Sequence, residues 1–380
     1  MRSGAGRVLV VAALLWAAIL GSVAVVVHRG DLRGFFVTGA LYGPPPGQPG
    51  WPVREGPGYD GQFFATLSRD PLLLDPATHA RLDDAAYRAG PIGLPLAAWV
   101  IAAGSPRAAP IVYLFLAWGL GLLGVWVAAR WLEDRRRSPW QAFPLALSGG
   151  LVAASLRGTP DAAAASLVLL GLWLEWRGGR GASPVLAAAS LVRETSLLGA
   201  AGVAIARFRD GRRSAALAAL LLPGLAVVAW RSWVHVAVGA PTHMRLLAST
   251  PVLWLRDKLA PPFTVQSVAE AAAILAVALA VAAGVALLPA WRRWTAAEWT
   301  YAGSCALAIG IGGIVYEDRW AASRVHALLP MLAAVLPAGE AGPRARWLLR
   351  LVPWACAGAG VLSLALSTRL AELLSRALAR

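Results

Sequence analysis

The sequence predicts an all-α polytopic membrane protein in which residues 1–380 form a single transmembrane domain. Hydrophobic residues make up 58% of the chain and charged residues only 14%, and the mean hydropathy is +0.60. A soluble core could not bury so much apolar side chain. Apolar runs of about 15 to 24 residues recur along the chain, close to the roughly 20 residues that a helix needs to cross a bilayer.

The net charge of +15 comes almost entirely from arginine, since Lys258 is the one lysine in the sequence. In a soluble protein such an excess would suggest nucleic acid as a partner. Here the arginines form short clusters between apolar runs, where they keep loops on the cytoplasmic side and can contact anionic lipid. We therefore expect a lipid bilayer, and no nucleic acid, as the partner of these charges.

The first part of the chain predicts one crossing followed by a large loop. Residues 8–27 are apolar and follow two arginines without a clear signal-peptidase site, which favours a retained span with a cytoplasmic N-terminus. The polar, proline-rich residues 28–90 then form a first extracytoplasmic loop. Residues 91–103 are apolar but too short for a typical crossing, so we expect an interfacial or re-entrant helix there.

Residues 183–206 predict a re-entrant helix pair. This segment is apolar except for Arg193 and Glu194 at its middle, and arginines flank it on both sides. Both flanks therefore favour the cytoplasm, which a single crossing cannot satisfy. Two short half-helices that turn at Arg193 satisfy it, because irregular backbone is tolerated at membrane depth where protein or water surrounds it.

With the remaining apolar runs, the prediction is a bundle of about nine crossings plus the re-entrant pair. The predicted crossings are residues 8–27, 109–129, 142–156, 161–176, 214–236, 266–288, 297–315, 323–336 and 347–366. This topology places the first loop, the start of the 161–176 run and the turn before residue 323 on the extracytoplasmic side.

Four short motifs on that side occur in a recognisable order: Gly58-Tyr-Asp-Gly-Gln-Phe-Phe64, Pro160-Asp161, Val192-Arg-Glu-Thr195 and Tyr316-Glu-Asp-Arg319. Together they resemble bacterial GT-C-type integral membrane glycosyltransferases, and the resemblance covers most of the chain. It implies a GT-C-like bundle in the bacterial inner membrane and a polyprenyl-phosphate-linked sugar as donor. It also implies inverting transfer to a glycan or lipid acceptor outside the cytoplasm, with an aspartate of the first loop as catalytic base.

Asp60 is the predicted general base. Glycosidic bond formation by direct displacement needs a carboxylate within hydrogen-bond reach of the acceptor hydroxyl. The flanking Gly58 and Gly61 permit a sharp turn, and the neighbouring Tyr59 and Gln62 are candidates for substrate binding. An Asx-turn in a surface loop is the alternative interpretation of this Asp-Gly pair.

Further substrate-binding candidates come from the next two motifs. Asp161 could accept hydrogen bonds from sugar hydroxyls, or it could serve only as a helix cap. Arg193 could grip the oxygens of the leaving phosphate, because a charge at membrane depth is by default a functional candidate. Alternatively, Arg193 forms a buried ion pair with Glu194 or with another acid and only fixes the hairpin. Glu194 is itself a substrate-binding candidate.

The outer turn of the fourth motif adds two acids and two arginines. Glu317 and Asp318 are candidates for binding sugar, and Arg319 and Arg324 are further candidates for the phosphate. A solvated turn is the alternative interpretation.

Many GT-C relatives carry two acids in the first loop where this chain offers Asp60, and the histidines are scattered. We therefore expect no metal ion and no cofactor.

The rival class of protein is a transporter or flippase of lipid-linked sugars, which would also combine many crossings with a broken helix and a buried charge. A transferase requires Asp60, Asp161, Arg193 and the 316–319 turn around one outward cavity. A transporter requires a polar path that reaches both faces. A noncatalytic scaffold would leave Asp60 and Arg193 without a role.

Overall fold

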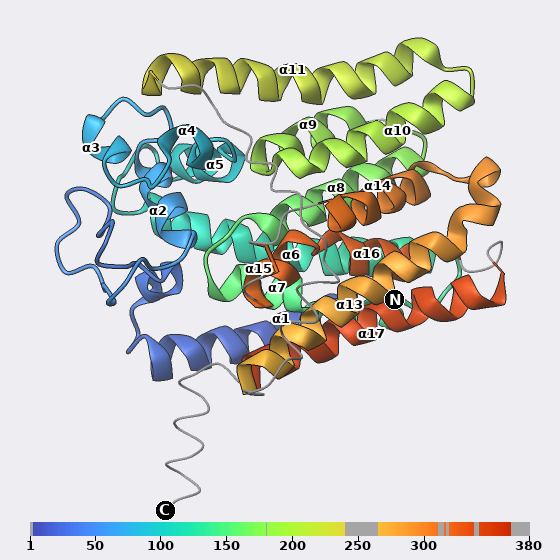
Figure 1. Cartoon of the computed structure of the whole chain (residues 1–380), viewed down its shortest axis with the longest axis horizontal. Helices are drawn as coiled ribbons and strands as arrows, with labels where there is room; N and C mark the ends of the chain where they lie inside the picture. The colour runs from blue at the N-terminus through green and yellow to red at the C-terminus, as the bar shows by residue number, and fades with distance from the viewer. Residues whose placement is uncertain are drawn as a thin grey trace, which may run out of the picture. The chain divides into compact units, whose positions relative to one another are not determined.

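The computed structural model describes residues 3–179, 181–239, 265–310, 315–316, 319–337 and 342–365, and in these ranges the chain is helical and contains no β-strand (Figure 1). Five helices of the described chain are long and apolar enough to cross a membrane. They are Gly4–Val26, Ala109–Asp134, Arg213–Val238, Ser267–Arg293 and Pro343–Ala365. An α-helical membrane protein is thereby confirmed, while the full set of nine crossings stays a prediction.

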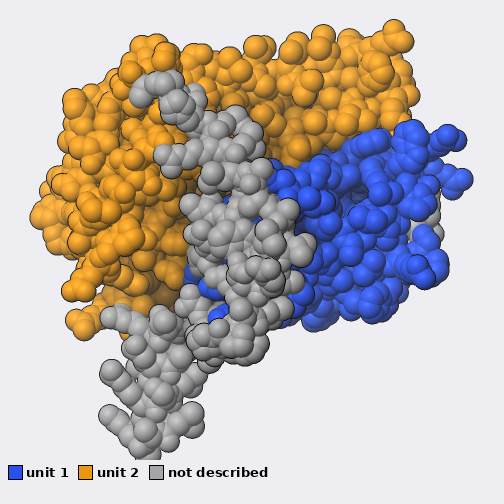
Figure 2. Space-filling model, in the orientation of Figure 1, with its two compact units in different colours: residues 1–12, 125–153, 246–380 blue, residues 13–124, 154–245 orange. Residues whose placement is uncertain are grey.

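The chain divides into two compact units (Figure 2). The first contains residues 1–12, 125–153 and 246–380, and the second contains residues 13–124 and 154–245. The divisions fall inside α1 (Gly4–Ser22), α6 (Ala109–Asp134) and α7 (Gly149–Leu156). All residues of the first, second and third sequence motifs belong to the second unit.

In the first unit, α13 (Val265–Leu287) packs against α17 (Pro343–Ala365). Among its described residues the unit also contains α14 (Ala296–Gly310), α15 (Arg319–Val325) and α16 (Leu328–Val335). Two predicted crossings are not continuous helices. Residues 142–156 consist of the end of a 3-10 helix (Pro139–Leu147) followed by α7, and residues 323–336 are divided between α15 and α16.

Proline explains the first of these differences. Pro144 lies inside the 3-10 helix, where it has no N–H to donate and its ring would clash with the carbonyl four residues earlier in an α-helix. The backbone becomes extended at Ser148 before α7 begins. Hydropathy alone could not reveal this break, because every residue around it is apolar or small.

In the second unit, the first loop is an ordered assembly of short helices. After α1 and a π-helical turn (Val23–Val27), a 3-10 turn (Leu32–Phe36) leads to α2 (Gly61–Arg69), α3 (Pro76–His79), α4 (Ala85–Arg88) and α5 (Gly93–Ile101). Phe36 and Phe64 pack on the ring of Tyr113 from α6, with ring centroids 5.9 and 6.0 Å away. The hydroxyl of Tyr113 donates to the carbonyl of Gly158 at 3.1 Å. This aromatic cluster fixes the loop on α6.

Four helices complete the second unit: α8 (Asp161–Trp176), α9 (Ala182–Val192), α10 (Leu197–Arg209) and α11 (Arg213–Val238). They pack side by side (Figure 1). Between α9 and α10 the helix is interrupted, because Arg193 is extended (φ −158°, ψ 126°) and a 3-10 turn (Glu194–Ser196) follows. The re-entrant placement of this pair in a membrane, like the interfacial or re-entrant placement of α5, stays a prediction.

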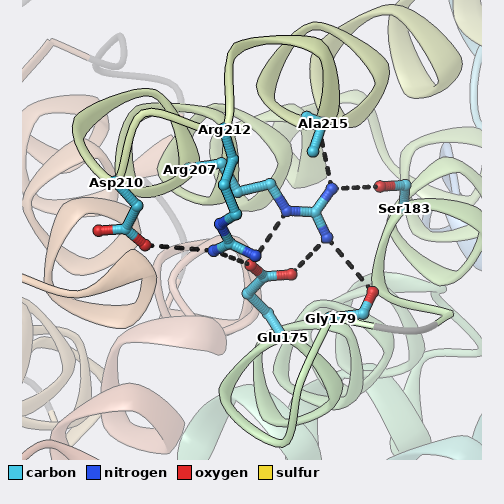
Figure 3. Close-up of polar contacts among 7 residues, drawn as sticks. All are labelled: Glu175, Gly179, Ser183, Arg207, Asp210, Arg212 and Ala215. Carbon is cyan, nitrogen blue, oxygen red and sulfur yellow. Dashed lines mark hydrogen bonds and ion pairs between the residues drawn. The ribbon is translucent and has the colours of Figure 1, made fainter.

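A buried ion pair ties the four helices together at the end opposite this interruption (Figure 3). The guanidinium of Arg207 pairs with Glu175 of α8, both side chains being only 7% exposed. It also donates to the hydroxyl of Ser183 at 3.3 Å and to the carbonyls of Ala215 at 3.0 Å and Gly179 at 3.3 Å. Since Glu175 follows the first residue of α8, Asp161, by 14 positions, this cluster lies about 21 Å from the other end of the helix.

Replacing Arg207 with leucine should destabilise the protein by about 3 kcal/mol, because the change leaves the buried Glu175 with only the more distant Arg212 as partner. Thermal unfolding in detergent measures the effect. The matched control is Arg209→Leu, an exposed position on the same helix, which should change stability by no more than about 0.5 kcal/mol. Equal effects of the two changes would contradict a structural role for the buried pair.

Candidate functional site

Asp60 lies at the start of α2 and is held by an arginine of the same loop. Its Oδ1 accepts a hydrogen bond from Nη1 of Arg88 at 2.9 Å. The same guanidinium binds both carboxylate oxygens of Asp83, at 2.6 and 2.7 Å, and lies 4.4 Å from the centre of the Phe63 ring. Asp60 is 22% exposed and Arg88 16% exposed. The carboxylate of Asp60 is therefore held by Arg88 but is still accessible to a substrate.

The charge on Arg88 is stabilised by its partners. Burial disfavours the cation, but the hydrogen bond to Asp83 and the attraction of the Asp60 and Asp83 carboxylates outweigh it and raise the pKa of Arg88 above its ordinary value. Arg88 is consequently cationic at any pH the protein would meet. A permanent cation therefore lies against the carboxylate of Asp60 and holds its orientation.

The start of α2 directly touches the turn that precedes α8. A Cβ atom built on Gly61 would lie 2.1 Å from the carbonyl oxygen of Arg157, so only glycine permits this approach of the two backbones. The guanidinium of Arg157 also lies 5.2 Å from the centre of the Tyr59 ring. Since Asp60 stands between Tyr59 and Gly61, it lies beside the turn that ends at Asp161.

Asp161 and Arg193 form an ion pair at this end of the helices. Asp161 is the first residue of α8, its side chain is 4% exposed, and its Oδ1 accepts from Nε of Arg193 at 2.9 Å. Its negative charge at a helix N-terminus is also favourable to the helix dipole. The extended backbone at Arg193 directs its side chain to α8, so the acid that pairs with Arg193 is Asp161 rather than its neighbour Glu194.

Glu194 is engaged by an arginine of α11. Its Oε1 pairs with Nη2 of Arg231, whose Nη1 donates to the carbonyl oxygen of Ala86 at 2.9 Å. The end of the first loop packs against this pair, since a Cβ atom on Gly90 would lie 2.4 Å from Oε1 of Glu194 and 2.3 Å from Nη2 of Arg231. Gly90 follows Arg88 by two residues.

These contacts bring three of the predicted motifs together in the second unit. The acids and arginines gathered there are Asp60, Asp83, Asp161, Glu194, Arg88, Arg157, Arg193 and Arg231. Packing of α5 against both α2 and α9 supports the same arrangement. The combination offers carboxylates that can take a proton or bind hydroxyls and guanidinium groups that can meet an anion.

Gln62 contributes mainly to the shape of the loop. It is 3% exposed, its Oε1 accepts from the backbone N–H of Gly39 at 3.0 Å, and its Nε2 donates to the carbonyl of Pro57 at 2.7 Å. Both ends of its amide thus hold backbone of the residues that precede Asp60. The predicted role of Gln62 in substrate binding, like that of Tyr59, stays a prediction.

The fourth motif belongs to the first unit. Glu317 and Asp318 lie outside the described residues, Arg319 begins α15, and Arg324 is buried near the end of that helix. The candidate site is therefore built from residues of the second unit. Among the described residues, no group of three or more His, Cys, Asp or Glu side chains is placed to hold a metal ion.

Sequence reasoning missed Arg231, Arg88 and Asp83. A signal for Arg231 was present, because it is a charged residue inside the apolar run 214–236 and the rule that singled out Arg193 applies equally to it. Arg88 and Asp83 carry no such signal. They lie in a polar loop with several other charges, and only the folded loop shows that Arg88 binds Asp60 and Asp83 with one guanidinium.

Comparison of the chain with protein-family models, with curated proteins and with solved structures finds no match. Inference about function therefore depends on the residues of the site and on their geometry.

Replacing Gly61 with alanine should destabilise the protein by about 1 to 3 kcal/mol, because the new methyl group would overlap the carbonyl of Arg157 and force two backbone segments apart. Thermal unfolding in detergent is the measurement. Gly119→Ala is the matched control, since Gly119 lies in α6 with no neighbouring atom within 4 Å of its Cβ position. If Gly61→Ala leaves the stability unchanged, α2 does not need its close contact with the turn.

Proposed function

We propose that this protein is an integral membrane glycosyltransferase of the bacterial cell membrane. It would move a hexose or pentose from a polyprenyl-phosphate donor to a glycan or lipid acceptor of the cell envelope, on the extracytoplasmic side and with inversion. The observation that carries the proposal is that the anchored carboxylate of Asp60 lies beside the turn that precedes α8, while Arg193 from the helix interruption pairs with the first residue of α8. The resemblance of four ordered motifs to GT-C enzymes supports the same function.

In the proposed reaction Asp60 is the general base. The hydroxyl oxygen of the acceptor attacks the anomeric carbon of the donor sugar, and the bond from that carbon to the phosphate oxygen breaks. The hydroxyl proton passes to Asp60, and polyprenyl phosphate leaves as the anion. Arg88 assists by fixing the orientation of Asp60 through the contact at 2.9 Å.

Arg193 is proposed to meet the phosphate of the leaving group. Its Nε–H donates to Asp161, which fixes the guanidinium, and the guanidinium is proposed to bind the phosphate oxygens. Negative charge increases on the phosphate as the glycosidic bond breaks, so a preorganised cation stabilises the transition state more than the bound donor. Tyr59 and Asp161 are proposed to contact the sugars.

The Asp60→Asn change tests the proposal. It preserves the size of the side chain and its acceptor oxygen but removes the base, so we expect kcat to fall by about 100- to 10,000-fold with little change in donor KM. The assay uses purified protein in lipid nanodiscs, a radiolabelled polyprenyl-phosphate sugar and a panel of envelope acceptors, and it measures the glycoside formed.

Asp83→Asn is the matched control, because Asp83 binds the same guanidinium as Asp60. If the two aspartates serve only to hold Arg88, both changes lower kcat equally, and the role of Asp60 as base is wrong. We expect Asp83→Asn to lower kcat by less than about tenfold. Movement of the labelled lipid between leaflets without any glycoside product would instead support a transporter or flippase.

A further inference from the structure

Helix α11 holds the first loop through three side-chain donors near its C-terminal end. The indole N–H of Trp230 donates to the carbonyl of Ala89 at 2.7 Å, and Nη1 of Arg231 donates to the carbonyl of Ala86 at 2.9 Å. The indole N–H of Trp233 reaches the carbonyl of Leu72 at 3.1 Å. All three acceptors are backbone oxygens, so α11 fixes the path of the loop itself.

Arg231 differs from the two tryptophans because it makes a second contact. The guanidinium that holds Ala86 also pairs with Glu194 at the helix interruption. Its planar fork allows one side chain to bind two acceptors on different segments of the chain, which a single donor such as an indole N–H cannot do. Arg231 therefore connects the first loop to the turn between α9 and α10.

The two segments that Arg231 connects carry the two principal groups of the site. On the loop side, Ala86 lies two residues before Arg88, which binds Asp60. On the other side, Glu194 directly follows Arg193. A shift of either segment would therefore change the separation between the carboxylate of Asp60 and the guanidinium of Arg193.

The location of Arg231 in an apolar helix indicates that its contacts with Ala86 and Glu194 have a functional role. Arg231 lies in an apolar helix that is long enough to cross a membrane, and its side chain is only 20% exposed. A charge there is unfavourable unless it is paired, and an apolar residue would fit the helix better. What the arginine supplies is a connection between the loop and the interruption.

We infer that Arg231 is a positioning residue that sets the separation between Asp60 and Arg193, and that Glu194 is its acceptor and does not bind sugar. The inference rests on the proposed function, because it assigns Arg231 a part in the same reaction. Misplacement of reacting groups by about 1 Å lowers rates by roughly a hundredfold. Loss of the Arg231 contacts should therefore lower kcat more than it weakens donor binding.

Kinetics of three variants test the inference. Arg231→Gln should lower kcat by about 10- to 100-fold and change donor KM by less than about threefold. Arg231→Lys keeps the charge but not the planar fork, so it should recover only part of the lost kcat. Glu194→Gln keeps the oxygen that accepts from Arg231 but removes the paired charge, so it should lower kcat by no more than Arg231→Gln does. A fall clearly larger than that of Arg231→Gln would show that the carboxylate itself acts on substrate and would overturn its assignment.

A second measurement does not depend on activity. Hydrogen exchange of residues 83–90 should be faster in Arg231→Gln than in wild type, because the loop loses its link to α11. The matched control is Arg213→Gln, an exposed arginine at the other end of the same helix, which should change neither exchange nor kcat. If Arg231→Gln does not fold, Trp230→Phe, which removes one neighbouring donor, should accelerate the same exchange and lower kcat by about two- to fivefold.

The outcomes separate this inference from the proposed function. If exchange is faster in Arg231→Gln but the wild-type protein transfers no sugar, the link between α11 and the loop is supported and the proposed glycosyltransferase function is overturned. Sugar transfer by the wild type together with faster exchange but unchanged kcat in Arg231→Gln would overturn the positioning role. Unchanged exchange and unchanged kcat would overturn both the link and the role.

Discussion

Pairing of arginines inside an apolar helical unit is the constraint on which the second unit depends. An unpaired charge in such surroundings is unfavourable by several kcal/mol, so each guanidinium must meet an acid or a carbonyl. Arg207 meets Glu175 at one end of α8 to α11, while Arg193 and Arg231 meet Asp161 and Glu194 at the other. Each pair joins segments from different helices, and together the pairs fix both ends of the four-helix arrangement.

Arginine contacts, together with aromatic packing, also hold the first loop in place although it is rich in proline and glycine. Its short helices cannot bury enough surface to be stable alone. They are held by the aromatic cluster around Tyr113, by Arg88 between two aspartates, and by the donors of α11 on backbone carbonyls. A loop fixed in this way can hold a carboxylate in one orientation, which is what proton transfer in a displacement reaction requires.

The comparison between sequence and structure is most informative at two places. Arginine clusters on both sides of residues 183–206 argued for a turn at Arg193, and in the structure α9 ends at Val192 and α10 begins at Leu197. The run 142–156 looked equally apolar, but it contains a 3-10 helix with Pro144 and a separate α7. Charge placement was the better guide because it reflects the whole segment, whereas hydropathy does not report the hydrogen-bond geometry of the backbone.

The sequence by itself determined that the protein is embedded in a membrane and where its long apolar helices lie, because both follow from the sum of local side-chain properties over a window of residues. It also supplied Asp60, Asp161, Arg193 and Glu194 as chemically capable groups. Only the tertiary structure decided their partners. The contacts of Arg88 with Asp60, Arg193 with Asp161 and Arg231 with Glu194 join residues 28, 32 and 37 positions apart. Which distant charges meet depends on how helices and loops pack, and no local pattern encodes that.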